Sequence, residues 1–325
     1  PRALEQATDE QIAAYKARRF PQDGLRVDGC CGIGGDLLAL GLGGKTVGYE
    51  QDPVVAYLAA ANCERLGRQN CRVVQADFTR IRLTPESAVH IDPDRRPRQR
   101  RSVQLDHHQP SRSFLARLIR TQPFVALKLA PATVPDDPLL WDAQLEWIGR
   151  GRECPQLVAW FGQAADRIGG RVATLLDPAG NSTSLEATQP APLDAARVVG
   201  EVVVEPHAVV LAAGLAGVLA EQLDLCALTA NGGYLTGSAG KPHPLARIYA
   251  VLEVTVLRRR HLRRLVQKHR MGQLEVKARG VSWNPDEVRR SLPLEGPEAG
   301  VLLLTRLADR QVAILARRIP SENPD

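Results

Sequence analysis

The stretch Leu25-Arg26-Val27-Asp28-Gly29-Cys30-Cys31-Gly32-Ile33-Gly34-Gly35-Asp36-Leu37-Leu38 decides the fold of this chain. An apolar strand runs into a glycine-rich turn, and the turn opens directly onto an apolar helix. Gly32, Gly34 and Gly35 tolerate positive φ and carry no Cβ, so a ligand can lie against the turn while helix N–H groups point at it. The pattern therefore predicts a cradle shaped for a nucleotide.

The residues around the glycines indicate which nucleotide the cradle holds. A dinucleotide fingerprint, Gly-x-Gly-x-x-Gly, read from Gly32 would need its third glycine at Leu37, where there is none. Asp28 inside the turn would repel a pyrophosphate, but it can bind an ammonium group. S-adenosylmethionine (SAM) carries an ammonium, a sulfonium and a ribose, and it has no phosphate. We therefore predict that this turn binds SAM.

Three later apolar runs also end in an acidic residue. Glu50 is placed to accept hydrogen bonds from both ribose hydroxyls. Asp77 offers an acceptor for an adenine amino group and Phe78 a ring to stack on, while the next run ends in Asp92-Pro93. One such acid alone is as readily a helix N-cap or a turn residue. Four acids at successive strand ends lie on one edge of a parallel sheet, and this arrangement favours a ligand site.

Length and composition set the broad class. A chain of 325 residues is long enough for two or three domains, and 44% apolar and 24% charged residues are typical of soluble globular proteins. The longest apolar run, 208–220, is too short to span a membrane and contains two glycines. The six cysteines form no Cys-x-x-Cys pair, so we expect reduced thiols, no metal and a cytoplasmic location.

Charge is distributed unevenly along the chain. Residues 247–319 hold 16 Lys and Arg against 7 Asp and Glu, a net charge of +9, whereas the whole chain carries +6 and the remainder therefore −3. A basic segment joined to a near-neutral one is the electrostatic pattern expected for a protein that binds a polyanion.

The order of elements predicts an α/β fold with a second domain. About seven strands separated mainly by helices, including a helix at 141–148, are typical of a doubly wound, mostly parallel sheet. The basic segment has the order β-α-β-α-β-β, which predicts a small α+β domain. The expected divisions are an N-terminal helical lid at 1–20, a SAM-binding Rossmann-like domain at 21–205, a bridging segment at 206–246 and the basic domain at 247–325. Thr8 is the expected N-cap of the lid helix, and the bridging segment is expected to open with a helix at 206–223.

Several of these motifs together resemble class I SAM-dependent methyltransferases, most closely the RNA cap guanine-N2 methyltransferases (trimethylguanosine synthases). The likeness is carried by 7–13, the glycine turn, Tyr49 to Pro53, Ala76-Asp77-Phe78 and Asp92-Pro93. Residues 274–280 and 284–286 are similar to the THUMP-like domain attached to bacterial enzymes of this kind, which implies RNA binding. The predicted cofactor residues are Thr8, Asp28, Gly32, Gly34, Glu50, Gln51, Asp77, Phe78 and Asp92.

The motif that selects the methyl acceptor departs from this family. Amino-directed methyltransferases follow the fourth strand with Asp/Asn/Ser-Pro-Pro and an aromatic residue, but here Asp94 and Arg95 replace the second proline and the aromatic residue. Asp92 and the Pro93 carbonyl remain the predicted catalytic groups, since they can accept the hydrogens of a conjugated amino group. The predicted substrate-binding residues, which would bind RNA, are Arg95, Arg96, Arg263, Arg264 and Lys268.

The leading hypothesis is therefore a SAM-dependent methyltransferase that modifies an RNA base and grips the RNA with its basic domain. Two alternatives stay open. The acceptor is a small molecule or a protein, or the chain is an RNA-binding protein that has lost its chemistry, as the Asp94-Arg95 departure suggests. No metal and no membrane partner is expected, and the oligomeric state is left open.

Overall fold

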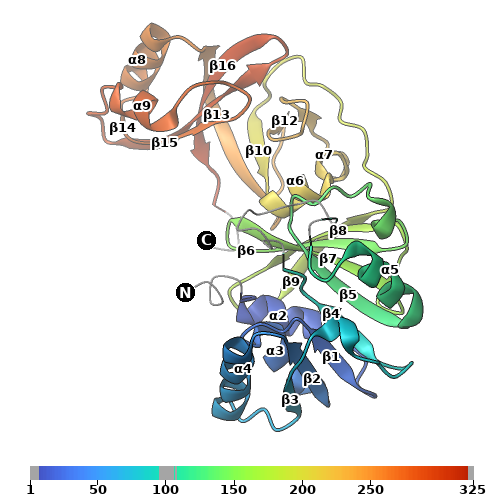
Figure 1. Cartoon of the computed structure of the whole chain (residues 1–325). Coiled ribbons are helices and arrows are strands. Elements are labelled where there is room, and N and C mark those ends of the chain that lie inside the picture. Colours follow the sequence, from blue (N-terminus) through green and yellow to red (C-terminus); the bar gives the residue numbers. More distant parts are fainter. Residues whose placement is uncertain (1–6, 95–105, 107, 321–325) are drawn as a thin grey trace. The chain divides into compact units, whose positions relative to one another are not determined.

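A computed structural model describes residues 7–94, 106 and 108–320, and the chain divides into two compact units, Pro1–Thr188 and Gln189–Asp325 (Figure 1). The second unit thus begins before the boundary expected at residue 205, and the segment 206–246 belongs to it. Arg95 and Arg96 lie outside the described residues.

The first unit is built on a nine-stranded sheet in the order β3-β2-β1-β4-β5-β7-β6-β8-β9. Strands β1 to β5 are mutually parallel, as the alternation of strands and helices predicts. Strand β7 is antiparallel to both of its neighbours, β5 and β6. The strands are β1 (Arg26–Gly29), β2 (Thr46–Glu50), β3 (Cys71–Gln75), β4 (Ala88–Ile91), β5 (Phe124–Leu129), β6 (Gln144–Arg150), β7 (Glu153–Gly162), β8 (Arg171–Leu176) and β9 (Ser182–Ala187).

The predicted helix at 141–148 is wrong, because this segment forms strand β6. Trp147 and Ile148 are fully buried, and Glu146 is nearly so. Polar and apolar residues alternate from Gln144 to Trp147, which is the period of a strand, but Ile148 and Gly149 interrupt this short alternation.

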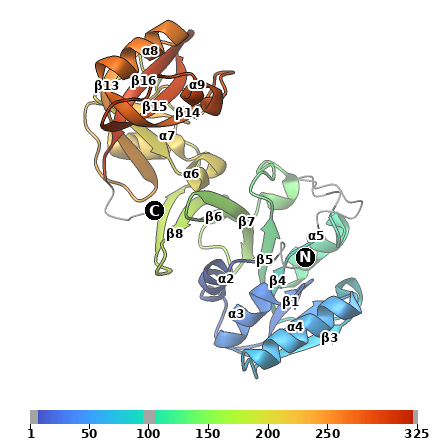
Figure 2. The same cartoon turned by 90° about the vertical axis from the view of Figure 1, so that its left-hand side faces the viewer.

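The helices of the first unit are α2 (Glu10–Ala17), α3 (Gly35–Gly43), α4 (Pro53–Arg65) and α5 (Arg112–Thr121), with 3-10 turns η1 (Phe78–Arg80) and η3 (Pro138–Leu140). Helix α2 lies beside α3 (Figures 1 and 2). Its N-cap is Asp9 and not Thr8, because the Asp9 carboxylate accepts hydrogen bonds from two N–H groups of the first turn. Ile12 of α2 packs in the hydrophobic core, as does Phe20 shortly after the helix, so α2 is anchored in the core.

The second unit contains a seven-stranded sheet in the order β11-β12-β10-β13-β16-β15-β14. From β13 onward the chain runs β-α-β-α-β-β, which confirms the predicted order. The predicted helix at 206–223 is two helices, because Gly214 adopts φ 70° and ends the first. The elements are β10 (Val202–Pro206), α6 (Ala208–Ala213), α7 (Ala216–Leu223), β11 (Cys226–Ala227), β12 (Leu235–Gly237), β13 (Ala246–Val256), α8 (Arg259–Lys268), β14 (Met271–Ala278), α9 (Pro285–Arg290), β15 (Glu298–Leu307) and β16 (Arg310–Arg318).

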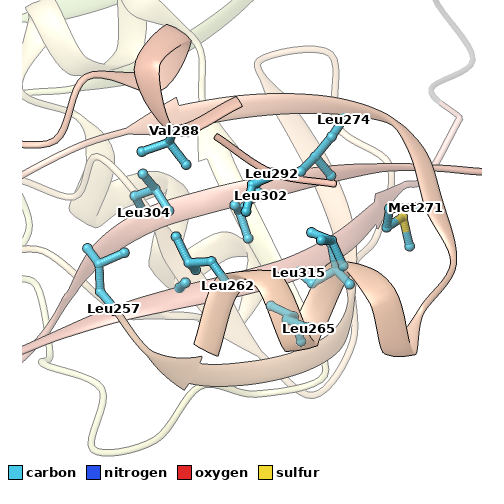
Figure 3. Packing of buried hydrophobic residues seen from close by; sticks show 12 residues of the cluster. Leu257, Leu262, Leu265, Met271, Leu274, Val288, Leu292, Leu302, Leu304 and Leu315 are labelled. Atoms are coloured by element: carbon cyan, nitrogen blue, oxygen red, sulfur yellow. The ribbon is translucent and has the colours of Figure 1, made fainter. Parts of the chain in front are cut away.

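One hydrophobic cluster fixes α8 and α9 on the second sheet (Figure 3). Leu262 and Leu265 of α8 pack in one cluster with Leu302 of β15 and Leu315 of β16, and Val288 of α9 joins them. Helix α8 therefore has one fully apolar side, and its charged residues lie elsewhere. Among the described residues, no helix is long and apolar enough to cross a membrane.

Candidate cofactor and acceptor site

A cavity of about 780 Å³ opens at the carboxyl ends of β1, β2 and β4, where the strand order of the first sheet reverses. In open α/β sheets this reversal point is the usual ligand site. The cavity is lined by Pro93 and by every predicted cofactor residue except Gly34, namely Thr8, Asp28, Gly32, Glu50, Gln51, Asp77, Phe78 and Asp92.

The glycine turn forms the floor of the cavity. Gly34 adopts φ 94° as the N-cap of α3, a conformation that favours glycine, so its role is to turn the chain. Gly32 also has positive φ, and a Cβ placed there would meet no atom within 4 Å. The space in front of Gly32 is therefore open to a ligand.

Asp28 is almost completely buried and only half satisfied. Its Oδ1 lies 2.7 Å from Nδ1 of His90, whereas its Oδ2 has no hydrogen-bond partner among the described residues. Burial raises the pKa of the Asp28 carboxyl, and the neighbouring His90 opposes that rise. An orphaned buried carboxylate oxygen costs about 1–3 kcal/mol or more. The ammonium of SAM would supply the missing donor, so this residue fits the predicted cofactor.

Glu50 is held rigidly at the end of β2. Its Oε2 accepts a hydrogen bond from the N–H of Gly32 at 3.1 Å, and its Oε1 accepts one from the N–H of Asp52 at 2.9 Å. Each carboxylate oxygen has two lone pairs, so one on each oxygen stays free for the hydroxyls of a ribose.

Asp77 and Phe78 both make contacts within the protein that the sequence analysis did not predict. The Asp77 carboxylate accepts hydrogen bonds from the N–H and the hydroxyl of Thr79, and these bonds lower the pKa of Asp77. Phe78 is buried, and its ring packs against Gly29 and against the ring of Tyr49, with centroids 5.6 Å apart. Phe78 is thus a wall of the cavity, fixed by the core.

Asp92 directly follows β4 and is paired with a lysine that the sequence analysis did not select. Lys128, from β5, donates from Nζ to Asp92 Oδ2 at 2.6 Å and to Thr8 Oγ1 at 2.9 Å. The Thr8 hydroxyl in turn donates to Asp36 Oδ2 at 2.6 Å. The signal available in the sequence was a single lysine near the end of an otherwise apolar buried strand.

The predicted RNA-binding residues of the second unit lie on α8. Arg263 and Arg264 are exposed, and neither has an ion-pair partner among the residues that the structure describes. Lys268 differs, because its Nζ is paired with Glu253 at 2.7 Å. Within the described chain, no group of three or more His, Cys, Asp or Glu side chains could hold a metal ion.

Together, the inserted antiparallel β7 and the nucleotide-shaped cavity define a class I methyltransferase. Residues 246–318 match the family model described as THUMP domain-like. Two curated proteins, from Mycobacterium tuberculosis strains CDC 1551 and H37Rv, are each 30% identical over 312 residues, covering 94% of this chain and 83% of theirs. Both are named as uncharacterised S-adenosylmethionine-dependent methyltransferases. This chain belongs to that family, and SAM is its cofactor.

The fold agrees with this assignment over the whole chain. The crystal structure of a methyltransferase candidate from Porphyromonas gingivalis W83 superposes with a TM-score of 0.77, covering 98% of this chain and 82% of that one. The two sequences are only 18% identical, so this likeness concerns the fold alone. When bound, SAM supplies an electrophilic methyl group. The residues of this chain bind SAM and orient the acceptor against it.

Proposed function

We propose that this protein methylates a base of an RNA, with the first unit transferring the methyl group and the second unit binding the RNA. The observation that carries the proposal is the THUMP-like match over 246–318, which coincides with the strongly basic part of the chain. THUMP-type domains bind RNA in the enzymes that this sequence resembles.

Helix α8 supports an electrostatic grip on RNA. Its buried residues, Leu262, Leu265 and Val266, are apolar, while Arg259, Arg263 and Arg264 are exposed. Exposed arginines without carboxylate partners are free to neutralise phosphates, which carry most of the affinity in nucleic-acid binding.

The acceptor group that best suits the cavity is an amino group of the base. Such a nitrogen is a poor nucleophile, because its lone pair is conjugated with the ring. Lys128 holds Oδ2 of Asp92, which leaves Oδ1 and the Pro93 carbonyl to accept the hydrogens of the amino group. A guanine amino group, as in the cap methyltransferases that the motifs resemble, is the finer proposal. Asp94 in place of the second proline is the feature that sets this chain apart.

Transfer of label from tritiated SAM tests the proposal. The protein is incubated separately with total bacterial RNA, protein and small-molecule fractions, and labelled RNA is digested to nucleosides to find the modified base. We expect label in the RNA fraction from the wild type and none from Asp92→Ala. Label only in the protein or small-molecule fraction would establish the alternative substrate class. RNA binding without label in any fraction would indicate a protein that has lost its chemistry.

A further inference from the structure

A buried lysine lies behind the cofactor cavity, and the mechanism above does not use it. Lys16 of α2 is 2% exposed. Its Nζ lies 2.6 Å from Asp36 Oδ1, 3.3 Å from His90 Nε2 and 3.5 Å from Gln156 Oε1. An ammonium has three donors and no acceptor, so these three neighbours satisfy it completely.

These contacts fix where the imidazole of His90 carries its proton. Burial lowers the pKa of Lys16, but the Asp36 carboxylate at 2.6 Å raises it and favours the ammonium. Because an ammonium can only donate, His90 Nε2 is the acceptor in its 3.3 Å contact with Lys16, which is shorter than the 3.7 Å from Nε2 to Asp36 Oδ2. The proton of a neutral imidazole then lies on Nδ1, from which it is donated to Asp28 Oδ1 at 2.7 Å. Lys16 thus selects one tautomer, and that tautomer orients Asp28.

One carboxylate of the cluster has no ammonium partner among the described residues. Asp36 is paired with Lys16 and Asp92 with Lys128, whereas Asp28 is paired with His90. Burial alone would raise the pKa of Asp36, but the ammonium groups of Lys16 and Lys128 lower it, so Asp36 stays ionised. The atom of the cluster that lacks a partner among the described residues is Oδ2 of Asp28, a residue that lines the cavity.

We propose that Lys16 and His90 are positioning residues for the amino-acid half of SAM: Lys16 fixes the His90 ring with its Nδ1 proton toward Asp28, and His90 holds Asp28 so that Oδ2 receives the cofactor's ammonium. Helix α2 is then a fixed part of the cofactor site. The inference rests on the SAM site and not on the RNA substrate, so a failed RNA methylation assay leaves it standing.

Two ligands separate this role from general packing. S-adenosylhomocysteine carries the amino-acid group, whereas 5′-methylthioadenosine has the same adenosine and sulfur but no ammonium. Two amide variants give the matched comparison. In His90→Asn the amide can occupy the place of Nδ1 and still donate to Asp28, while in His90→Gln it reaches the place of Nε2, and the bond to Asp28 is lost.

Titration calorimetry on the full chain measures the affinities of the wild type and both variants for the two ligands. We expect His90→Gln to weaken S-adenosylhomocysteine binding about ten- to a hundred-fold and methylthioadenosine binding less than about twofold, because one charge-assisted hydrogen bond is lost. His90→Asn should stay within about threefold of the wild type for both ligands. Equal losses for both ligands in His90→Gln, or no loss for either, would overturn the proposal.

A measurement on the unaltered protein keeps the proposal testable even where a variant fails to fold. In ¹⁵N-histidine NMR spectra at neutral pH, His90 should show the signature of the neutral Nδ1–H tautomer. In Lys16→Met that tautomer should no longer be enforced. A wild-type His90 protonated only on Nε2, or on both nitrogens, would overturn the proposal.

Discussion

Asp28 and Glu50 are expected to bind different parts of the cofactor. They lie near the ends of neighbouring strands and face different parts of the cavity. Asp28→Asn removes the charge expected to meet the ammonium, so it should weaken S-adenosylhomocysteine by about 1.5–3 kcal/mol and leave methylthioadenosine nearly unchanged. Glu50→Gln should weaken both ligands, since both contain the ribose. Calorimetry measures these affinities, with Glu64→Gln, an exposed acid on α4, as the control. Wild-type affinities in both variants would contradict the placement of the cofactor.

Lys128 contacts both Asp92, the predicted acceptor of the amino hydrogens, and Thr8, a predicted cofactor residue, and we expect its loss to affect turnover more than cofactor binding. Lys128→Met removes the group that orients both Asp92 and Thr8. We expect a fall in kcat of about ten- to a hundred-fold, because small displacements of positioned groups are costly. Affinity for S-adenosylhomocysteine should change less than about threefold, and Lys128→Arg should recover part of the rate.

Single-turnover transfer to the RNA fraction, measured beside calorimetry, separates the two effects. The opposite pattern, lost cofactor affinity with normal transfer, would place Lys128 in the cofactor site and not beside the acceptor.

The acids of the site could be predicted from the sequence, but their partners could not. Each acid follows a recognisable apolar run, so its place at the sheet edge is set locally. Lys16, His90 and Lys128 come from three different elements and meet only in the folded chain. A charged residue inside an apolar segment indicates that a buried partner exists, but nothing in the local pattern says which one.

Among the secondary structure elements, α8 combines an apolar side in the core with exposed arginines, and this is the basis of its predicted role. Replacing Arg263 and Arg264 by Ala should weaken RNA binding and reduce the slope of log affinity against log salt by about 0.7–0.9 per lost phosphate contact. Turnover of the RNA-saturated enzyme should hardly change, because uniform binding does not alter the chemical step.

The matched control replaces Arg65 and Arg72 by Ala, which makes the same change of charge on exposed residues of the first unit. Binding isotherms at several salt concentrations compare the two double variants. An unchanged affinity and slope in the α8 variant would rule out this helix as the RNA grip.

A bidentate ion pair between Arg112 and Asp137 holds helix α5 in place. Arg112 donates to the two carboxylate oxygens of Asp137 at 2.7 and 2.6 Å, and this pairing lowers the pKa of Asp137. A carboxyl whose pKa is lower in the folded state stabilises the fold above its unfolded pKa of about 3.9 and loses that contribution as the pH falls through its folded pKa. Asp137→Asn should therefore cost about 1 kcal/mol at pH 7 and progressively less toward about pH 2.

Urea unfolding of both proteins at the two pH values tests this effect. Asp136→Asn, at a neighbouring and largely exposed position, is the control. A difference that persists unchanged at low pH would mean that the substitution acts through packing and not through charge.

Elements with one polar face were predicted from the sequence more reliably than elements buried on both sides. The basic helix at α8 has an unambiguous helical period, and Asn284 before Pro285 marks the start of α9 as predicted. Helices α6 and α7 are mostly apolar and carry no such period, and in β6 polar and apolar residues alternate over only four positions, 144–147. The type of β6 and the break after α6 depend on the neighbours that bury them, so the sequence alone assigned β6 to a helix and missed the break between α6 and α7.

At the scale of the whole molecule, the two units each complete their own sheet, and the second sheet needs strand β10. β10 lies between β12 and β13 in that sheet, with Val203 in its core. Glu205 of β10 is buried and accepts hydrogen bonds from Lys277, Arg279 and Tyr249. Burial alone would raise the pKa of Glu205, but these partners lower it. The THUMP-like match begins at residue 246 and so leaves out β10. Lys277 and Arg279 lie inside the match, but their partner Glu205 lies on that strand.

Two fragments test where the folding unit begins. The fragment 189–325 contains every strand of the second sheet, so it should melt cooperatively and bind RNA without binding S-adenosylhomocysteine. The fragment 246–325 exposes the paired edge of β13 and leaves Lys277 and Arg279 without Glu205. An open apolar edge invites association with other chains, so we expect this fragment to aggregate or to melt at a clearly lower temperature. Circular dichroism and light scattering follow both fragments. If the shorter one melts as cooperatively and at the same temperature as the longer one, β10 is dispensable, and the sequence match alone defines the domain.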